Sequence, residues 1–221
     1  MLKSRHVRAS ELDSGVANAT ENSLDDDGLW QSFKTGNELA FSLLYKRHVQ
    51  RLYNYGMHTC MDKDLVKDCL QELFARLWDK RETLGVAGSV NYYLFKSFRR
   101  LLINRVVSKR KFSIPFQGQP ESVFEFIPSF ESYLIEKETK SYQFERLKSS
   151  IQSLSKRQRE AIFLKFFNEL SYHEVASIME MRVDSVYNLM SKTIDILRAK
   201  LRDIPYFSLF LACFSSFQNN L

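Results

Sequence analysis

Between residues 170 and 201, the chain carries two runs in which apolar residues recur every three or four positions, the period of an amphipathic helix. In the first run, Ser171 and Glu174 have the spacing of a capping box, which predicts that a helix begins there. Ala176 is small enough to let a second helix cross closely. The second run follows Glu180, and its apolar positions are Val186, Met190, Ile194, Leu197 and Leu201. The pattern predicts two helices joined by a tight turn.

Two such helices can form a helix-turn-helix, in which the second helix enters the major groove of DNA. The polar face of the second helix carries Asn188, Ser191 and Lys192, whose side chains can hydrogen-bond base edges and phosphates. An ordinary amphipathic hairpin has the same apolar pattern. The pattern alone leaves both interpretations open.

The first half of the chain, from residue 29 to about residue 111, also has a helical period throughout. Four helices are expected there: at 26–34, from about 38 to beyond 52, at 62–80 and at 89–110.

Three of the four prolines, Pro115, Pro120 and Pro128, then lie within fourteen residues and break the helical period. This segment is acidic and has no Lys or Arg between Lys111 and Lys137. Helical periodicity returns near residue 134. We therefore expect an all-α protein with two small helical domains joined by a flexible linker. The expected parts are a disordered leader (1–27), a first domain (28–111), an acidic linker (112–136), a second domain (137–203) and an apolar tail (204–221).

The apolar tail is too short to cross a membrane as a helix. Fourteen apolar residues, 204–217, would span about 21 Å, against a hydrocarbon core of about 30 Å. Packing on the protein's own surface, on a partner or on a membrane face all remain open. The first residues contain no apolar run of a secretory signal, which favours a cytoplasmic protein.

Composition points to a polyanionic partner and a reducing environment. The formal net charge is +6 and the pI is near 9.2. Cys60, Cys69 and Cys213 form no CxxC pattern. Because Cys69 falls on an apolar helix face, we expect it to be a buried, reduced thiol.

The expected helix at 62–80 has one charged face, which carries Asp64, Asp68, Gln71, Glu72 and Asp79. Such a face is usually only solvated, and the functional alternative is a surface that docks another protein.

The expected helix at 89–110 interleaves aromatic and basic residues. Leu94, Phe95, Phe98 and Leu102 are expected to be core. Cations neutralise phosphates, and aromatic rings stack on unpaired bases for about 1–3 kcal/mol each. This mixture suits single-stranded or opening DNA, unless the aromatic residues are all core and the basic ones merely solvated. Tyr92 or Tyr93, near the start of the helix, is the better candidate for stacking.

These segments together resemble a known family. In order, they are DLVKDCLQELFARLW, YLFKSFRRLLINRVVSKRK, a proline-bearing linker, LSKRQREAIFLKFF and LSYHEVASIMEMRVDSVYNLMSKTIDILR. The series is similar to sigma-70 family transcription initiation factors of the small, two-domain extracytoplasmic-function (ECF) group. The form YLFKSFRR is similar to members from Bacteroidetes-type bacteria. The resemblance covers roughly residues 29–202.

The resemblance implies that the chain gives bacterial core RNA polymerase its promoter specificity. Residues implied to bind core polymerase are Asp64, Asp68, Gln71 and Glu72. Those implied to recognise the minus-ten element, melt it and hold a flipped base are Tyr92, Tyr93, Lys96, Arg99, Arg100, Asn104, Arg105, Lys109 and Arg110. Those implied to read the minus-thirty-five element are Arg157, Arg182, Ser185, Asn188, Ser191 and Lys192. The linker is implied to thread toward the polymerase cleft, and an anti-sigma factor is the usual regulator.

The chain departs from the family pattern at the helix-turn-helix. Glu180 stands where the turn often has Gly, which predicts mild backbone strain. Arg182 replaces the Ser that usually caps the second helix, although Asp184 can partly substitute through the helix dipole. Because the second helix is less basic than is typical, Arg157, Arg159 and Lys165 are expected to support DNA affinity.

The sequence does not support an enzyme. Its four histidines are scattered, with no HExxH, no Cys/His cluster and no Gly-rich phosphate loop, so no cofactor, metal or small-molecule substrate is expected. His173, inside the capping box, is expected to be a surface residue. Two rival functions are less favoured. A stand-alone helix-turn-helix regulator that binds a symmetric operator would need neither the aromatic and basic helix nor the charged docking face. A nucleic-acid-processing enzyme would need metal-binding carboxylates that converge in a cleft, whereas those at 64–79 have a docking explanation.

Overall fold

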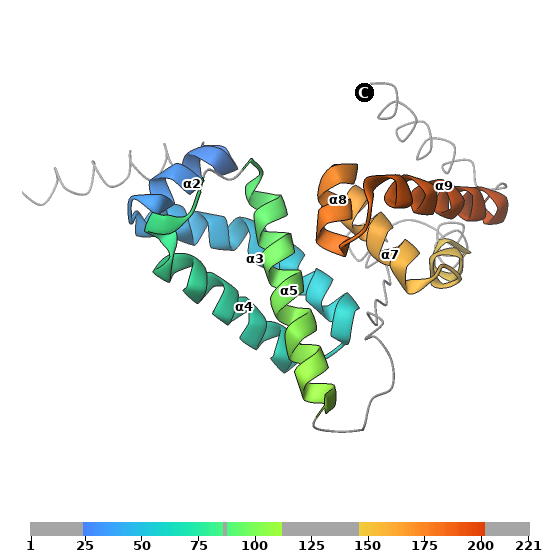
Figure 1. Ribbon diagram of the computed structural model, residues 1–221, viewed down its shortest axis with the longest axis horizontal. Helices are drawn as coiled ribbons and strands as arrows, with labels where there is room; N and C mark the ends of the chain where they lie inside the picture. The colour runs from blue at the N-terminus through green and yellow to red at the C-terminus, as the bar shows by residue number, and fades with distance from the viewer. Residues whose placement is uncertain (1–23, 86–87, 112–145, 202–221) are drawn as a thin grey trace, which may run out of the picture. The chain divides into compact units, whose positions relative to one another are not determined.

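The computed structural model describes residues 24–85, 88–111 and 146–201, and their regular structure is entirely helical (Figure 1). This confirms the all-α prediction. The chain divides into two compact units. Unit 1 is built on α2 (Asp26–Lys34), α3 (Glu38–Cys60), α4 (Lys63–Asp79), a 3₁₀ turn (Arg81–Thr83) and α5 (Val90–Lys111). Unit 2 is built on α7 (Lys156–Ile162), η2 (Phe163–Phe167), α8 (Tyr172–Met179) and α9 (Val183–Lys200).

The expected leader up to residue 23, the linker, the return of helical period near residue 134 and the tail from residue 204 lie outside the described residues.

Each helix of unit 1 begins at a side chain that accepts hydrogen bonds from the first turn. The carboxylate of Asp25 accepts from Gly28 N–H at 2.9 Å, and Asn37 Oδ1 accepts from Leu39 N–H and Ala40 N–H. Asp62 Oδ1 accepts from Leu65 N–H at 3.1 Å. Such caps satisfy backbone donors that have no partner inside the helix. The helices predicted at 26–34, 62–80 and 89–110 are confirmed to within one residue.

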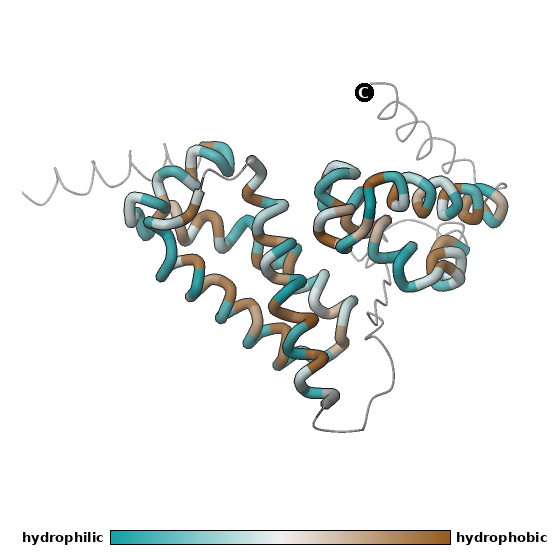
Figure 2. The backbone as a smooth tube through the Cα atoms, in the orientation of Figure 1, coloured by the Kyte–Doolittle hydropathy of each residue, from teal (hydrophilic) through white to brown (hydrophobic). Residues whose placement is uncertain are grey.

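Aromatic packing holds unit 1 together. The ring centroids of Trp30 and Phe33 lie 5.5 Å apart, and those of Tyr55 and Phe95 lie 5.6 Å apart in a T-shaped arrangement. The core includes the expected apolar side of α5, where Leu94, Phe95, Phe98 and Leu102 are all buried. Cys69 is a free, buried thiol, as expected. Hydrophilic and hydrophobic positions alternate along α4 and α5, so each helix has one side for the core and one for solvent (Figure 2).

Helices α3, α4 and α5 approach closely at Gly56. A Cβ atom added to this glycine would lie 2.7 Å from Val66 Cγ1 and 3.1 Å from Phe98 Cζ. A glycine inside a helix costs about 1 kcal/mol relative to alanine. Close packing of three helices therefore explains why the chain has glycine here.

Unit 2 is a short helical bundle in which two arginine side chains donate hydrogen bonds to backbone carbonyl groups at helix ends. Residues 146–152 are helical, and Arg159 donates from Nη1 to the carbonyl oxygens of Gln152 and Leu154. Arg146 donates to the carbonyl of Lys200 at 2.8 Å. After α7 the backbone widens into the π-helical turn η2, which the apolar period did not predict. The buried amide of Asn168 donates to the carbonyl of Phe163 at 3.0 Å, which satisfies one backbone acceptor near this irregular turn.

Helices α8 and α9 form the predicted pair with a tight turn. The capping box at Ser171 and Glu174 is present, and His173 is exposed as expected. Glu180 ends α8 in the left-handed region, with φ 55° and ψ 46°, which confirms the expected strained position. Met181 N–H donates to the carbonyl of Ala176 at 2.9 Å, and Ala176 is buried beneath the turn. The apolar face of α9 is buried as predicted: Val186, Met190, Ile194, Leu197 and Leu201.

Candidate protein and nucleic-acid interfaces

The charged face predicted on α4 lies at the surface of unit 1. Asp64, Asp68, Gln71 and Asp79 are exposed, whereas Glu72 is partly covered, with 22% of its side chain exposed. Buried Val66, Cys69, Leu70, Leu73, Phe74 and Leu77 form the opposite side. The carboxylates are therefore accessible to a partner rather than sealed in the core.

Helix α5 presents polar side chains at the surface of unit 1. Lys96, Arg100, Asn104, Arg105 and Lys109 are exposed, and Arg99 is half-buried. The side chain of Arg110 lies outside the described residues. Lys96, Arg100 and Asn104, each four residues apart, share one side of α5, whereas Arg105 and Lys109 lie on the side that faces α4.

The two tyrosines at the start of α5 differ in surroundings. Tyr93 packs edge-on against Trp30 with ring centroids 5.3 Å apart, so it contributes to the core. Tyr92 instead accepts a 2.8 Å hydrogen bond from Lys96 Nζ, which also lies 5.3 Å from the Tyr92 ring centroid. Of the two candidates, Tyr92 has the ring next to a cation at the surface, as stacking on a base beside its phosphate would require.

Two ion pairs join α4 and α5 directly. Arg105 Nη2 lies 2.8 Å from Glu72 Oε2, and Lys109 Nζ lies 2.6 Å from Asp62 Oδ2. Glu72 also pairs with Arg76 one turn later on α4. The hydrogen bond from Lys109 is the main cause that holds the pKa of Asp62 below its ordinary value. Residues assigned by sequence to separate surfaces are thus linked through Glu72 and Arg105.

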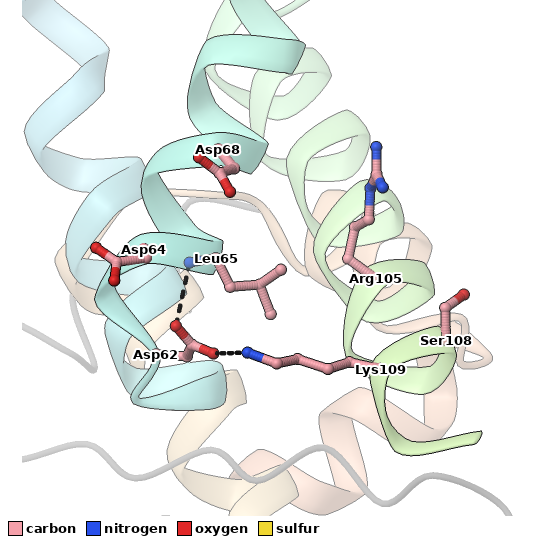
Figure 3. Close-up of a pocket in the computed structure, with 7 residues that line it drawn as sticks. All are labelled: Asp62, Asp64, Leu65, Asp68, Arg105, Ser108 and Lys109. Carbon is pink, nitrogen blue, oxygen red and sulfur yellow. Dashed lines mark hydrogen bonds and ion pairs between the residues drawn. The ribbon is translucent and has the colours of Figure 1, made fainter. Parts of the chain in front are cut away.

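The ion pair at the start of α4 lies at a pocket whose lining residues are mostly charged (Figure 3). Lys109 reaches across from α5 to Asp62, which also caps α4 through Leu65 N–H. The sequence pattern did not single out Asp62 as a site residue. The sequence does mark Asp62 as an N-cap residue, because an aspartate stands directly before the predicted helix. A carboxylate in that position can also pair with a cation on a neighbouring helix, as Asp62 does with Lys109 of α5. The pocket is lined by Asp62, Asp64, Leu65, Asp68, Arg105, Ser108 and Lys109.

In unit 2 the outer side of α9 carries the predicted groove-reading residues, all exposed: Arg182, Ser185, Asn188, Ser191 and Lys192. Arg182 is the N-cap residue and makes no capping hydrogen bond from its side chain. Arg182 Nη2 lies 3.6 Å from Oδ2 of Asp184. Asp184 is in the first turn of α9, where the helix dipole favours a negative charge. Asp195 pairs with Arg198 at 3.1 Å. Acidic residues therefore accompany the cations of this face.

Of the three auxiliary cations expected in unit 2, one is exposed. Arg157 is exposed at the surface of α7. Arg159 is engaged with backbone carbonyls, and Lys165 Nζ lies over the Tyr172 ring, 4.7 Å from its centroid. Burial lowers the pKa of Lys165, so its position is partly desolvated.

A stacked tyrosine pair supports the orientation of α9. Tyr172 of α8 and Tyr187 of α9 have ring centroids 4.4 Å apart and planes inclined by 29°. Tyr187 is not among the apolar positions predicted for this helix, whereas the structure gives it a packing role between the two helices.

Neither a metal site nor a membrane span is found in the described parts of the chain. No group of three or more His, Cys, Asp or Glu residues there could hold a metal ion. No helix there is long and apolar enough to cross a bilayer.

Comparisons with known proteins match both units. The family model of sigma-70 region 2 matches residues 44–112, and that of sigma-70 region 4 matches residues 144–194, together more than half of the chain. No curated protein matches the chain significantly in sequence.

Two solved structures share the fold. One is CnrH in complex with the cytosolic domain of CnrY, with TM-score 0.51 and 18% identity, covering 81% of this chain and 98% of that one. The other is the sigma factor RpoE with the anti-sigma factor NepR from Bartonella quintana, with TM-score 0.51 and 18% identity, covering 74% and 98%. The matched regions together with this architecture show that the chain belongs to the sigma-70 family of RNA polymerase sigma factors.

Proposed function

We propose that the chain is a cytoplasmic, two-region sigma factor of the ECF group, which brings bacterial core RNA polymerase to promoters and opens the DNA there. The observation that carries the proposal is the arrangement within unit 1. Exposed carboxylates of α4 and exposed cations of α5 occupy neighbouring surfaces of one small bundle. A protein that docks on polymerase while holding a DNA strand needs both surfaces close together.

Each surface has a proposed role. On α4, Asp64, Asp68, Gln71 and Glu72 bind core polymerase. On α5, the row from Tyr92 to Arg110 binds the minus-ten element. Its cations neutralise the phosphates of the nontemplate strand, while Tyr92 stacks on an exposed base. Flipping that base costs a few kcal/mol, which stacking and phosphate contacts offset.

In unit 2, α9 enters the major groove at the minus-thirty-five element. Asn188, Ser191 and Lys192 face the bases, with Arg182 and Ser185 at the start of the helix and Arg157 at the phosphates. Because Asp184 and Asp195 reduce the positive charge of this helix, unit 2 alone binds weakly, and polymerase supplies the rest of the affinity through unit 1.

The remaining parts of the proposal concern organisation and partners. We assign residues 28–111 to region 2, 112–136 to a linker that threads toward the polymerase cleft and 137–203 to region 4. An anti-sigma factor is the proposed regulator, since both structural neighbours are described in complex with such a partner or a cytosolic domain. The YLFKSFRR segment suggests that polymerase from a Bacteroidetes-type bacterium is the cognate enzyme.

The test separates docking from DNA opening with one variant on each surface. Asp68→Lys reverses an exposed charge on α4, and Arg100→Ala removes an exposed cation on α5. With core polymerase from a Bacteroidetes-type bacterium, Asp68→Lys should weaken association with core. Arg100→Ala should leave association unchanged and reduce permanganate reactivity of promoter thymines. Asp79→Lys, which reverses a charge at the far end of the same face, measures the general electrostatic effect.

Two results would contradict the proposal. One is tight, symmetric promoter binding by the protein alone that core polymerase does not alter, as a stand-alone regulator would show. The other is equal loss of core association in both variants.

A further inference from the structure

The ion pairs between α4 and α5 connect the two surfaces to which we assign different partners. Arg105 and Lys109 are exposed cations, with 56% and 67% of their side chains accessible. Each lies within 2.8 Å of a carboxylate, which for Arg105 is Glu72 of α4 and for Lys109 is Asp62, the N-cap residue of α4. Glu72 is the more covered carboxylate, at 22%, because Arg76 and Arg105 lie on its two oxygens. These contacts bridge 33 and 47 positions along the chain, so they depend on the fold rather than on sequence proximity.

We propose that Glu72 and Asp62 are restraining residues, which hold Arg105 and Lys109 in ion pairs that must exchange for DNA phosphate before the promoter strand can bind α5. This inference rests on the proposed function, since it assumes that α5 binds a strand. A phosphate beside Arg105 competes with the Glu72 carboxylate for the same guanidinium donors and is repelled by it. In the free protein the pairs therefore lower DNA affinity.

Docking on polymerase favours release of Arg105 from its ion pair with Glu72. Glu72 belongs to the α4 face that we assign to core polymerase, so a cation of the polymerase that reaches Glu72 replaces Arg105 as its partner. Arg105 is then available to phosphate, and DNA affinity rises when the protein is on the enzyme. By linkage, DNA on α5 leaves Glu72 freer to bind polymerase, so each ligand strengthens the other.

The chain provides an internal comparison on the same helix. Arg100 is exposed on α5 and makes no ion pair with the described residues. It should contact DNA without any prior exchange. Removal of Glu72's charge should therefore alter what Arg105 contributes to DNA binding and leave the contribution of Arg100 unchanged.

The experiment measures binding of the full-length protein, without polymerase, to a fluorescent single-stranded oligonucleotide by anisotropy over a salt titration. The variants are Glu72→Gln, Asp62→Asn and, as the matched control, Asp79→Asn. Asparagine at position 62 keeps an N-cap side chain, so α4 retains its start. Each of the three variants removes one negative charge from the same helix and its cap.

The expected result is a gain of about 1.5- to 5-fold in affinity for Glu72→Gln and for Asp62→Asn, beyond any gain in Asp79→Asn, since exposed ion pairs are weak. The plot of log affinity against log salt should steepen by about 0.7 for each Arg or Lys side chain freed from its ion pair. This is the change expected when one further phosphate of a single strand is neutralised. The Glu72→Gln gain should disappear in an Arg105→Gln background and persist in an Arg100→Gln background.

The proposal is overturned if Glu72→Gln and Asp62→Asn behave like Asp79→Asn, or if the gain persists without Arg105. A second measurement with saturating core polymerase should show that Glu72→Gln no longer increases promoter affinity, because docking has already occupied Glu72; an undiminished gain there also contradicts the exchange. Transcription by the wild-type protein with core polymerase tests the proposed function separately. Failure of the restraint leaves that transcription intact.

Discussion

Gly56 offers a stringent test of how unit 1 is packed. In Gly56→Ala, the new methyl group would lie 2.7 Å from Val66 Cγ1, 3.0 Å from Val66 Cγ2 and 3.1 Å from Phe98 Cζ. Valine is stiff at χ1 and fully buried here, so it cannot turn away. Overpacking of this kind costs about 1–3 kcal/mol, and alanine returns about 1 kcal/mol through its helix propensity. The net loss of stability should be about 0–2 kcal/mol.

The two tryptophans of the chain make this loss measurable without dividing the protein. Trp30 and Trp78 both belong to unit 1, so tryptophan fluorescence follows the unfolding of that unit alone. Each kcal/mol should lower the melting temperature by about 4–8 °C for a domain of this size. Gly88→Ala is the control, because nothing lies within 4 Å of a Cβ there, and its melting temperature should not fall.

A double-mutant cycle with Val66→Ala distinguishes the clash from other effects. Val66→Ala alone should destabilise unit 1 by leaving a cavity. In the Gly56→Ala background the same change should cost at least about 1 kcal/mol less, since the new methyl group fills the space and the clash is gone. Additive effects, or a Gly56→Ala protein more stable than the wild type, would refute the packing argument.

Three further predictions concern other strained, buried or stacked groups. Glu180→Gly should stabilise unit 2 by about 0.5–1 kcal/mol, because glycine adopts the left-handed conformation without strain; slower amide exchange in α8 and α9 is the readout, and faster exchange would contradict it. Tyr187→Ala should destabilise unit 2 by about 1–2 kcal/mol through loss of the stack on Tyr172, whereas Tyr187→Phe should retain most of it; equal exchange rates in the two variants would count against the stack. His48 Nε2 lies 2.8 Å from Asp26 Oδ2, but burial is the main influence and lowers the pKa of His48 below 6.5. As pH falls, His48 is therefore protonated in the unfolded chain before it is protonated in the folded protein. The stability that neutral, buried His48 contributes is complete above pH 6.5 and is lost as pH falls through the folded-state pKa. Fluorescence melts of His48→Gln should show a weaker dependence on pH in that window; an unchanged dependence would refute the assignment.

The sequence predicted the features that depend on local pattern. The capping box at Ser171, the buried face of α9 and the core side of α5 all follow from helical spacing and cap chemistry, which act within one turn of helix. The left-handed residue at Glu180 was also foreseeable, because a turn between two helices requires that conformation somewhere.

Features that depend on two elements meeting in space were not predictable in this way. Nothing in the spacing of α4 and α5 states that Arg105 pairs with Glu72, since that contact depends on the crossing of the two helices. The same holds for the Tyr172–Tyr187 stack and for the close approach at Gly56. The π-helical turn η2 interrupts the period over five residues, too few for a sequence pattern to register.

The central claim is that this chain supplies promoter specificity to a polymerase that lacks it. The most direct measurement adds the purified protein to sigma-free core polymerase with fragmented genomic DNA and maps the 5′ ends of the transcripts. We expect transcripts from a limited set of start sites, each preceded by shared minus-ten and minus-thirty-five sequences. The number of these transcripts should fall sharply with Arg100→Ala or Asp68→Lys. Starts scattered as with core polymerase alone would contradict it.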